Sequence, residues 1–312
     1  MSRPLTYNAT LVERADLSAT LAIFRIRPDA IPPREQLWFE PGQYISLGLN
    51  DGPARGTGSV RRAYSIASEP EERRWLEFYV RRIARPASAY PFTHLLWGMR
   101  PGDRMHVGSR ITGRFTVEHT VGLDDPRVKL LVAAGTGLAP FLSMVRSARR
   151  RLPRRPAGRL VVLHGASHAH ELGHREEIVR ALTDLGGDYL PTVSRPEGSP
   201  AWDGATGRVE SFLEGDRLVA LERRLGFPPG GMVPQNAVAF VCGLQGTIAE
   251  ALVRLARRGF VADDRRMRRL LRIPEGTPGS LFFEQYDNEP VIDPEDGALL
   301  ERLRGDLDRA VG

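Results

Sequence analysis

The chain has 312 residues, of which 41% are hydrophobic and 26% charged, so it can bury a core in two domains of ordinary size. Its single cysteine, Cys242, excludes an internal disulfide and a resident iron–sulfur cluster, which takes about four cysteine ligands. No run approaches the roughly 18 apolar residues of a membrane span and no signal segment opens the chain, so we expect a cytoplasmic protein without membrane insertion.

The charge pattern is ambiguous. A net charge of +6 suits an acidic protein partner or nucleic acid, but Lys129 is the only lysine beside 43 arginines, which indicates a compositional bias. The arginine-rich stretches 146–159 and 265–272 lack interleaved aromatic residues, so we expect no nucleic-acid binding. The histidines at 164, 168, 170 and 174 lack the companion cysteines or carboxylates of a zinc site, and we expect no bound metal.

The first third of the chain shows short segments separated by turns. Residues 20–27 and 42–49 alternate apolar and polar side chains, and residues 75–82 are rich in aromatic and β-branched types. Long amphipathic helices are absent from the pattern. It predicts a small antiparallel β-barrel domain over residues 1–124.

After Asp124-Asp125-Pro126 the pattern changes to apolar strands that alternate with helices. Strands are expected over 128–134, 160–164, 189–194 and 237–242, and helices over 140–151, 170–185 and 246–258. A long polar connection, 198–234, contains one helical stretch at 209–225. The predicted fold class is α/β plus all-β, with a doubly wound parallel sheet over residues 125–286.

Residues 287–312 form an acidic tail with eight acidic residues and three arginines. Asp293-Pro294, followed by leucines at 300, 303 and 307, predicts a capped helix with one apolar face. That face must dock on another part of the protein. One hypothesis is that the tail shields a basic docking surface for a partner.

The segment Arg62-Ala63-Tyr64-Ser65-Ile66-Ala67-Ser68 carries the clearest chemistry. Alternate side chains of a strand point the same way, so Arg62, Tyr64 and Ile66 share a face. A guanidinium can pair with a pyrophosphate, a phenol ring offers a flat face to an isoalloxazine, and a hydroxyl can bond flavin N5. An ordinary edge strand would explain the same residues.

In context, this segment resembles the flavin-binding signature of the ferredoxin–NADP reductase family, Arg-x-Tyr-Ser-x-x-Ser, and the resemblance continues in order to Tyr286. The resemblance implies that a flavin-binding barrel precedes a nicotinamide-binding α/β domain. It implies FAD as cofactor, with Arg62 at the pyrophosphate, Tyr64 on the flavin ring and Ser65 near N5. Ser68 completes the signature.

Two further segments carry the resemblance to the adenosine half of the flavin site. Phe78-Tyr79-Val80-Arg81 is similar to the family strand that flanks the adenosine, and Arg110-Ile111-Thr112-Gly113 to its turn against the phosphates. Thr112 and Gly113 are therefore candidate FAD contacts. Residues 86–97 depart from the usual phosphate-binding stretch, where Ser88 or Thr93 is a candidate substitute.

The run Gly135-Thr136-Gly137-Leu138-Ala139-Pro140-Phe141 follows an apolar strand and opens a helix. Unpaired backbone amides and the helix dipole form a cradle for pyrophosphate at such a place, and glycine permits close approach. A structural turn would explain a lone Gly-x-Gly, but the whole run closely matches the family's nicotinamide-domain entry. The resemblance implies that Gly135, Thr136, Gly137 and Pro140 contact NADP(H).

Ser194-Arg195 ends an expected strand and Arg208 follows nearby, so two guanidiniums can converge on an adenosine 2′-phosphate. This favours NADP over NAD. Relatives often place a further arginine after the second strand, where this chain has Ser167 and His168. Two solvated arginines in an arginine-rich protein are the competing explanation.

Two segments near the end complete the resemblance. Cys242-Gly243 is similar to a family element beside nicotinamide C4, which implies a positioning role, although a buried cysteine is more often merely small and apolar. Residues 281–286 resemble the aromatic segment that covers the flavin or the adenine, with Tyr286 as the candidate contact. Aromatic core packing would also explain them.

These features predict an FAD-dependent oxidoreductase that transfers electrons between NADP(H) and a one-electron carrier, ferredoxin or flavodoxin, by hydride transfer at flavin N5. The expected catalytic residues are Tyr64, Ser65, Cys242 and Tyr286, without a general base. A positively charged body would steer an acidic carrier. The alternatives are an NAD(P)H-dependent flavin or quinone reductase, a separate oxygenase reductase component, and a flavin-bound redox sensor without turnover.

Overall fold

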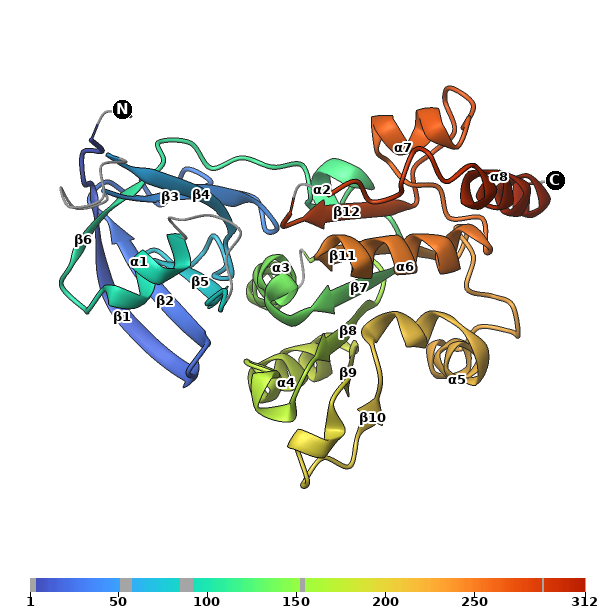
Figure 1. The fold of residues 1–312 in the computed structure, drawn as a ribbon, viewed down its shortest axis with the longest axis horizontal. Helices are drawn as coiled ribbons and strands as arrows, with labels where there is room; N and C mark the ends of the chain where they lie inside the picture. Colours follow the sequence, from blue (N-terminus) through green and yellow to red (C-terminus); the bar gives the residue numbers. More distant parts are fainter. Residues whose placement is uncertain (1–3, 51–57, 85–91, 152–154, 288, 312) are drawn as a thin grey trace. The chain divides into compact units, whose positions relative to one another are not determined.

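The computed structural model describes residues 4–50, 58–84, 92–151, 155–287 and 289–311. It divides into unit 1, with Met1–His119 and Ala139–Arg155, and unit 2, with Thr120–Leu138 and Pro156–Gly312. Each unit is built on one six-stranded sheet (Figure 1). The functional domain limits at residues 124 and 286 stay a prediction, and Ser88 lies outside the described residues.

Unit 1 contains an antiparallel sheet in the order β4-β3-β6-β1-β2-β5. Its strands are β1 (Ala9–Ser18), β2 (Leu21–Pro28), β3 (Tyr44–Leu49), β4 (Val60–Ser65), β5 (Leu76–Arg81) and β6 (Arg104–Val107). Just after β4, the backbone N–H of Ala67 donates to the carbonyl of Glu77 on β5 at 2.8 Å. This bond joins the two ends of the sheet, and the expected antiparallel barrel is confirmed.

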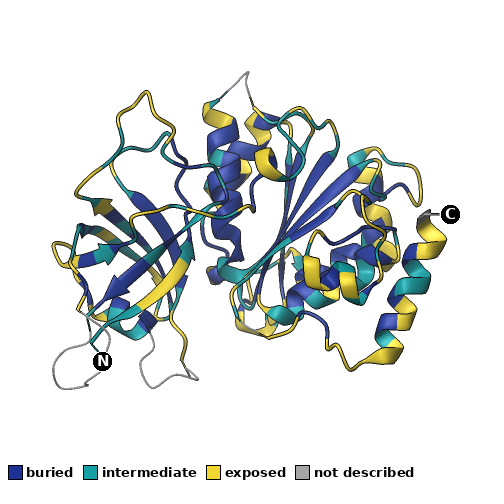
Figure 2. Ribbon diagram, turned by 90° about the horizontal axis from the view of Figure 1, so that it is seen from above, coloured by how far each residue is buried: buried dark blue, intermediate teal, exposed yellow. Residues whose placement is uncertain are grey.

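The barrel core follows the two-residue period of its strands. On β2, Ala22, Phe24 and Ile26 are fully buried, whereas Ile23 and Arg25 between them are partly exposed. A short helix, α1 (Phe92–Gly98), adds Phe92 and Leu96 to the same core. Figure 2 colours the strands by burial, and buried positions occur beside partly or fully exposed ones in the barrel.

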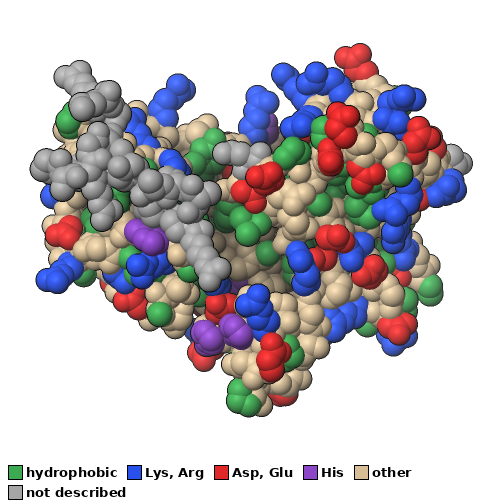
Figure 3. Space-filling view, viewed as in Figure 1, with side chains coloured by type: hydrophobic (Ala, Val, Ile, Leu, Met, Phe, Trp, Pro, Cys, Tyr) green, Lys and Arg blue, Asp and Glu red, His purple; other side chains and the backbone are tan. Residues whose placement is uncertain are grey.

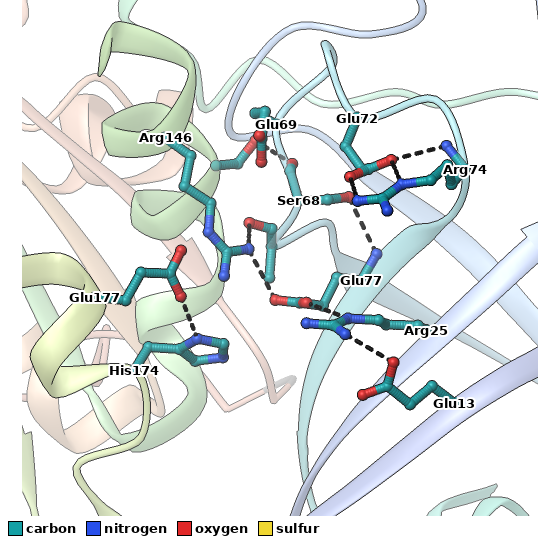
Figure 4. Close-up of polar contacts among 12 residues, drawn as sticks. Glu13, Arg25, Ser68, Glu69, Glu72, Arg74, Glu77, Arg146, His174 and Glu177 are labelled. Atoms are coloured by element: carbon teal, nitrogen blue, oxygen red, sulfur yellow. Dashed lines mark hydrogen bonds and ion pairs between the residues drawn. The ribbon is translucent and has the colours of Figure 1, made fainter. Parts of the chain in front are cut away.

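Helix α3 (Ala139–Arg150) belongs to unit 1, where a buried anion ties it to the barrel (Figure 4). The Glu77 side chain is 3% exposed and accepts from Arg146 Nη1 at 2.8 Å and from Arg25 Nε at 2.9 Å. Arg146 Nη1 also donates to the Ala67 carbonyl at 2.8 Å. One carboxylate therefore links α3, β2 and the turn after β4.

Unit 2 contains a parallel sheet in the order β10-β9-β8-β7-β11-β12. Its strands are β7 (Val128–Ala134), β8 (Leu160–Ala166), β9 (Asp188–Val193), β10 (Ala205–Thr206), β11 (Ala237–Gly243) and β12 (Leu281–Gln285). The chain builds outward from β7 in one direction and then from β11 in the other. The expected doubly wound sheet is confirmed, and its order reverses between β7 and β11.

Helices cover both faces of this sheet (Figure 1). The 3₁₀ turn η4 (Val209–Leu213) and helices α5 (Gly215–Leu225), α6 (Gln245–Ala256) and α8 (Gly297–Val311) share one apolar core with β7, β8 and β11. Helix α4 (Arg175–Leu185) packs on β8 and β9. The remaining helices are α2 (Val117–Thr120) and α7 (Arg265–Leu270), and the remaining 3₁₀ turns are η1 (Gly135–Leu138), η2 (Ala169–Glu171) and η3 (Pro196–Gly198).

Three predicted helices begin or continue differently in the structure. The 209–225 stretch is interrupted at Gly215, whose φ of +55° is left-handed, and the 170–185 stretch at His174, whose φ is +60°. The tail helix begins at Gly297, because Asp296 Oδ1 accepts the Leu299 N–H at 3.0 Å and acts as its cap. No helix among the described residues has the length and apolar character needed to cross a membrane.

We expect Glu77→Gln to lower the free energy of unfolding by about 3 kcal/mol, because it leaves two guanidiniums without a buried anion. Urea unfolding at neutral pH measures this cost. The matched control is Glu13→Gln, which removes the other carboxylate on Arg25, at 2.7 Å, from a side chain that is 48% exposed. The control should cost less than about 1 kcal/mol, and equal costs would contradict the assigned role of Glu77.

Candidate functional site

The flavin signature lies at the end of β4 beside a turn that the sequence places far away. Ser65 pairs with Tyr44 of β3, and the other edge of Tyr44 bonds Thr112 in both directions, at 2.8 and 3.0 Å. Tyr44 therefore brings Ser65 and Thr112 into one row. The structure thus assembles two of the predicted FAD-binding segments.

Gly113 shows why this turn needs glycine. Its φ is +124°, and a Cβ there would lie 3.1 Å from the Tyr44 ring. Gln43 Nε2 donates to the Gly113 carbonyl at 3.2 Å and holds the turn against β3. The Thr112-Gly113 backbone is therefore fixed close to the end of β4.

Tyr64 and Arg62 differ in burial although both belong to β4. The Tyr64 ring packs 5.7 Å from the Phe92 ring and 6.4 Å from the Phe78 ring. Burial raises the pKa of the Tyr64 phenol well above its usual range, against the opposing effect of Arg62, so the phenol stays protonated. The Arg62 side chain is exposed, donates to the Arg61 carbonyl at 2.8 Å, and has no carboxylate partner in the described part of the chain.

Ser68 and Thr93 have buried hydroxyls that support the barrel. Ser68 Oγ accepts the Glu77 N–H at 3.0 Å, and the Ser68 carbonyl accepts from Ser143 Oγ of α3 at 2.8 Å. Thr93 Oγ1 accepts the Ile83 N–H at 3.4 Å. Ser68 thus joins β5 to α3, and its contact with FAD stays a prediction.

In unit 2, the glycine-rich turn follows β7 at the place where the strand order reverses. A Cβ on Gly137 would lie 2.2 Å from the Cys242 carbonyl oxygen at the end of β11, so only glycine fits. Gly135 has a φ of +55°, and no heavy atom lies within 4 Å of its Cβ position. Pro140 lies in the first turn of α3, where its missing N–H breaks no helical bond. The turn is packed against β11 on one side and open at Gly135.

Tyr286 joins the predicted residues at this strand edge. Its hydroxyl donates to the Thr136 carbonyl at 3.3 Å and its side chain makes a hydrogen bond with Cys242. Its backbone N–H donates to the Gly243 carbonyl at 3.1 Å. The ring is 41% exposed. Thr136, Cys242, Gly243 and Tyr286 therefore form one cluster.

The Cys242 thiol is fully buried. Burial raises its pKa well above the usual range and nearby Glu284 raises it further, while the Tyr286 hydrogen bond opposes them. The thiol is therefore neutral at neutral pH. This state suits a small positioning side chain and does not suit a thiolate nucleophile.

His164 of β8 contacts the same turn through the Gly135 carbonyl. The sequence did not indicate this role for His164. Its Nε2 lies 3.1 Å from the Gly135 carbonyl, which can only accept, so Nε2 carries the proton and Nδ1 accepts from the Tyr189 hydroxyl at 2.8 Å. Complete burial lowers the pKa of His164 to about 4, although the Gly135 bond raises it. A histidine inside an apolar strand was the available sequence signal.

The predicted phosphate-binding arginines follow two neighbouring strands. Ser194 and Arg195 follow β9, where the Arg195 N–H donates to the Ser167 carbonyl at 2.9 Å, and Arg208 follows β10 after Gly207. Both arginines are exposed at the same edge of the sheet. Arg208 Nε is oriented by the buried Glu210 carboxylate at 2.5 Å.

Comparison with known proteins agrees with this architecture. Residues 8–115 match the model of the oxidoreductase FAD-binding domain, and residues 131–252 match the oxidoreductase NAD-binding domain. Ferredoxin–NADP reductase B of Sorangium cellulosum is 34% identical over 225 residues, which span 71% of this chain and 80% of that protein. The chain belongs to the ferredoxin–NADP reductase family.

Other similar proteins include a second ferredoxin–NADP reductase, the reductase subunit of a demethylase and a solved reductase structure. Ferredoxin–NADP reductase of Azotobacter vinelandii is 29% identical over 69% of this chain and 77% of its own length, and the reductase subunit of an Amycolatopsis aromatic O-demethylase is 32% identical over 66% and 56%. The solved structure of a Neisseria gonorrhoeae ferredoxin NADP⁺ reductase with FAD and NADP superimposes with a TM-score of 0.67, at 22% identity, over 90% of this chain and 98% of that one. The last comparison supports the fold.

The cofactors of this flavoenzyme family are FAD and NADP(H), and the side chains present fit them. The exposed Arg62 guanidinium can pair with a pyrophosphate. The space over Gly135 leaves the turn open to a dinucleotide. The individual contacts of these residues stay predictions.

We expect Gly137→Ala to lower the free energy of unfolding by about 2 kcal/mol and to weaken NADP⁺ binding, because its Cβ would push the turn away from Cys242. Gly135→Ala is the matched control for stability alone, since it adds left-handed backbone strain of about 1 kcal/mol without a steric clash. Urea unfolding and NADP⁺ titration measure both effects. A Gly137→Ala protein as stable as the parent would contradict the close approach.

His164 should make stability fall with acidity. Its folded pKa of about 4 lies below the ordinary 6.5, so its contribution is complete above pH 6.5 and is lost as pH falls towards 4. Relative to His164→Gln, the parent protein should lose about 2 kcal/mol of unfolding free energy between pH 7 and pH 5. Denaturant unfolding at both pH values measures this, and parallel losses in the two proteins would disprove the assignment.

Proposed function

We propose that this protein is an FAD-dependent oxidoreductase that transfers electrons between NADPH and a one-electron carrier protein, a ferredoxin or flavodoxin. The observation that carries the proposal is the cluster of Thr136, Cys242, Gly243 and Tyr286 at the strand edge where the sheet order reverses. Open α/β sheets bind their ligands at this place. The names of the Sorangium and Azotobacter relatives support a carrier protein as partner.

In this proposal, residues of the chain bind and orient the nicotinamide dinucleotide and the flavin. The turn at Gly135–Leu138 offers amides to the dinucleotide pyrophosphate, and the buried, neutral Cys242 thiol adds no competing nucleophile to this strand edge. The flavin, when bound, supplies hydride acceptance at N5 and releases electrons singly. In unit 1, Arg62, Tyr64, Ser65, Thr112 and Gly113 are the proposed flavin contacts. No proton transfer by a side chain is required.

A preference for the 2′-phosphorylated cofactor is part of the proposal. Arg195 and Arg208 follow adjacent parallel strands. The buried Glu210 carboxylate orients the Arg208 guanidinium, while the Arg208 side chain stays 62% exposed. A second guanidinium without a carboxylate among the described residues is available at Arg195. Two such groups can share one phosphate. We also propose a cytoplasmic location.

One alternative has a specific observation in its favour. The Amycolatopsis relative is a reductase subunit of an aromatic O-demethylase, so an oxygenase component is a second candidate for the electron acceptor. The single cysteine of this chain means that an iron–sulfur centre would belong to that partner. The two proposals share the NADPH half of the reaction and differ in the protein that takes the electrons.

The testing experiment is anaerobic reduction of the purified yellow holoprotein, followed at the flavin absorption band. We expect NADPH to bleach it at least about tenfold more efficiently than NADH. Arg208→Gln should lower the NADPH rate by about tenfold and leave the NADH rate nearly unchanged, because only the phosphate contact is lost. Arg223→Gln is the control, since it removes an exposed arginine in the last turn of α5 that does not follow a strand of the sheet.

Each outcome separates one part of the proposal. A protein that stays colourless after incubation with FAD would refute the flavoenzyme assignment. Equal bleaching rates with NADPH and NADH would refute only the proposal that Arg195 and Arg208 bind the 2′-phosphate. Carrier-linked turnover with a ferredoxin or flavodoxin, set against turnover with free flavin or quinone, would then decide the acceptor.

A further inference from the structure

The arginines of residues 265–272 are not used by the proposed reaction. Five of these eight residues are arginine, and they form helix α7 and the turn after it. Ahead of α7, Val261 accepts backbone bonds from Ser280 and Leu281, so α7 connects to the amino end of β12. Tyr286 follows the carboxyl end of β12, and a five-residue strand separates the two ends by roughly 15 Å. The arginines thus lie away from the proposed nucleotide edge.

This short helix is held by contacts from other elements. Met267 and Leu271 are buried in the core of unit 2, and Asp264 Oδ1 caps the helix by accepting the Met267 N–H at 2.8 Å. Arg304 of α8 donates to the Leu270 carbonyl from Nε at 3.1 Å and from Nη2 at 2.7 Å. A six-residue helix has little stability of its own, so these contacts fix where its arginines lie.

The arginines surround a depression of about 480 Å³. Its lining consists of Arg265, Arg268, Arg269, Arg272, Ile273 and Glu275. Arg268 is held by Asp263 at 3.8 Å and by the Thr277 carbonyl. The other three arginines have no carboxylate partner within the described ranges of the chain. In Figure 3, basic side chains gather with some acidic ones over the part of unit 2 where Figure 1 labels α7.

Arg272 is in a backbone conformation that favours glycine. Its φ is +54°, in the left-handed region just after the helix, where its N–H bonds the Arg269 carbonyl at 3.2 Å. Glycine is the usual residue at such a helix end because it avoids the strain of a Cβ. The chain instead has Arg272, which is one of the residues that line the depression. Strain kept at one position points to a role of the side chain.

We propose that this depression binds a small anion that carries two or more phosphate groups, at a site separate from the nucleotide edge. Guanidiniums pair with phosphate oxygens in two-pronged fashion, and four of the six lining residues are arginines, against one glutamate. No aromatic side chain is among the lining residues that the structure describes, so the site lacks a stacking platform for bases.

The proposal goes beyond electron transfer and is tested without turnover. Inorganic pyrophosphate is titrated calorimetrically into the full-length holoprotein at low salt, and the Arg208→Gln protein is titrated in the same way to identify binding at the proposed nucleotide edge. We expect the Arg269→Gln/Arg272→Gln protein to bind pyrophosphate at least about tenfold more weakly than the parent. Arg266→Gln is the matched control, because Arg266 is an exposed arginine of the same helix outside the lining. It should change the affinity less than about twofold.

Arg272→Gly separates binding from folding. Removing the left-handed strain should raise the melting temperature, and losing the guanidinium should weaken pyrophosphate binding. A higher melting temperature with unchanged affinity would overturn the role of Arg272. Equal losses in Arg266→Gln and the double variant, or no binding by the parent, would overturn the site itself. If the variants change only the KM for an acidic carrier protein, the depression is a docking surface and the small-anion proposal is wrong.

Discussion

The contact between Gly137 and the carbonyl of Cys242 is the constraint on which the nucleotide edge depends. It brings the turn after β7 against the end of β11, the two strands between which the sheet order reverses. Because no Cβ fits there, the turn, the thiol and the Tyr286 hydroxyl share one small region. Gly137 thus allows the backbone of the turn to lie against the end of β11. This contact fixes the position of the turn amides and the helix dipole, which can then attract a pyrophosphate.

Three buried polar side chains, Glu77, His164 and Lys129, reinforce this frame, and each has hydrogen-bond partners. Glu77 has two guanidiniums, and neutral His164 bonds a carbonyl and a phenol. Lys129 is fully buried beside the Asp125 carboxylate and donates to the Ala157 carbonyl at 2.8 Å. A charge without such partners would cost several kcal/mol in an apolar core. The partners come from distant segments, so these groups fix how the elements of each unit meet.

Strand periodicity was enough to predict both sheets, because alternation on β2 and apolar runs on β7 and β11 follow directly from one-sided and two-sided burial. The family resemblance supplied the cofactors and the candidate residues. Other features depend on pairing that no local pattern contains, such as the two-residue strand β10, the buried His164 bonds and the ties from α3 to Glu77. Helix ends were missed where one left-handed residue, Gly215 or His174, breaks an otherwise continuous pattern.

The tail illustrates how burial limits a functional hypothesis. Leu300, Leu303 and Leu307 lie in the core that α8 shares with α6 and β11, so α8 is a structural element of unit 2. Its acidic residues, such as Glu301 and Asp308, are exposed on the other side of the helix. Deleting the tail would therefore expose apolar core residues and remove the hydrogen bond from Arg304 to the Leu270 carbonyl of α7. These losses do not depend on the charge of the tail. A shielding role can be separated from this structural one only by changing the exposed carboxylates while the three leucines stay.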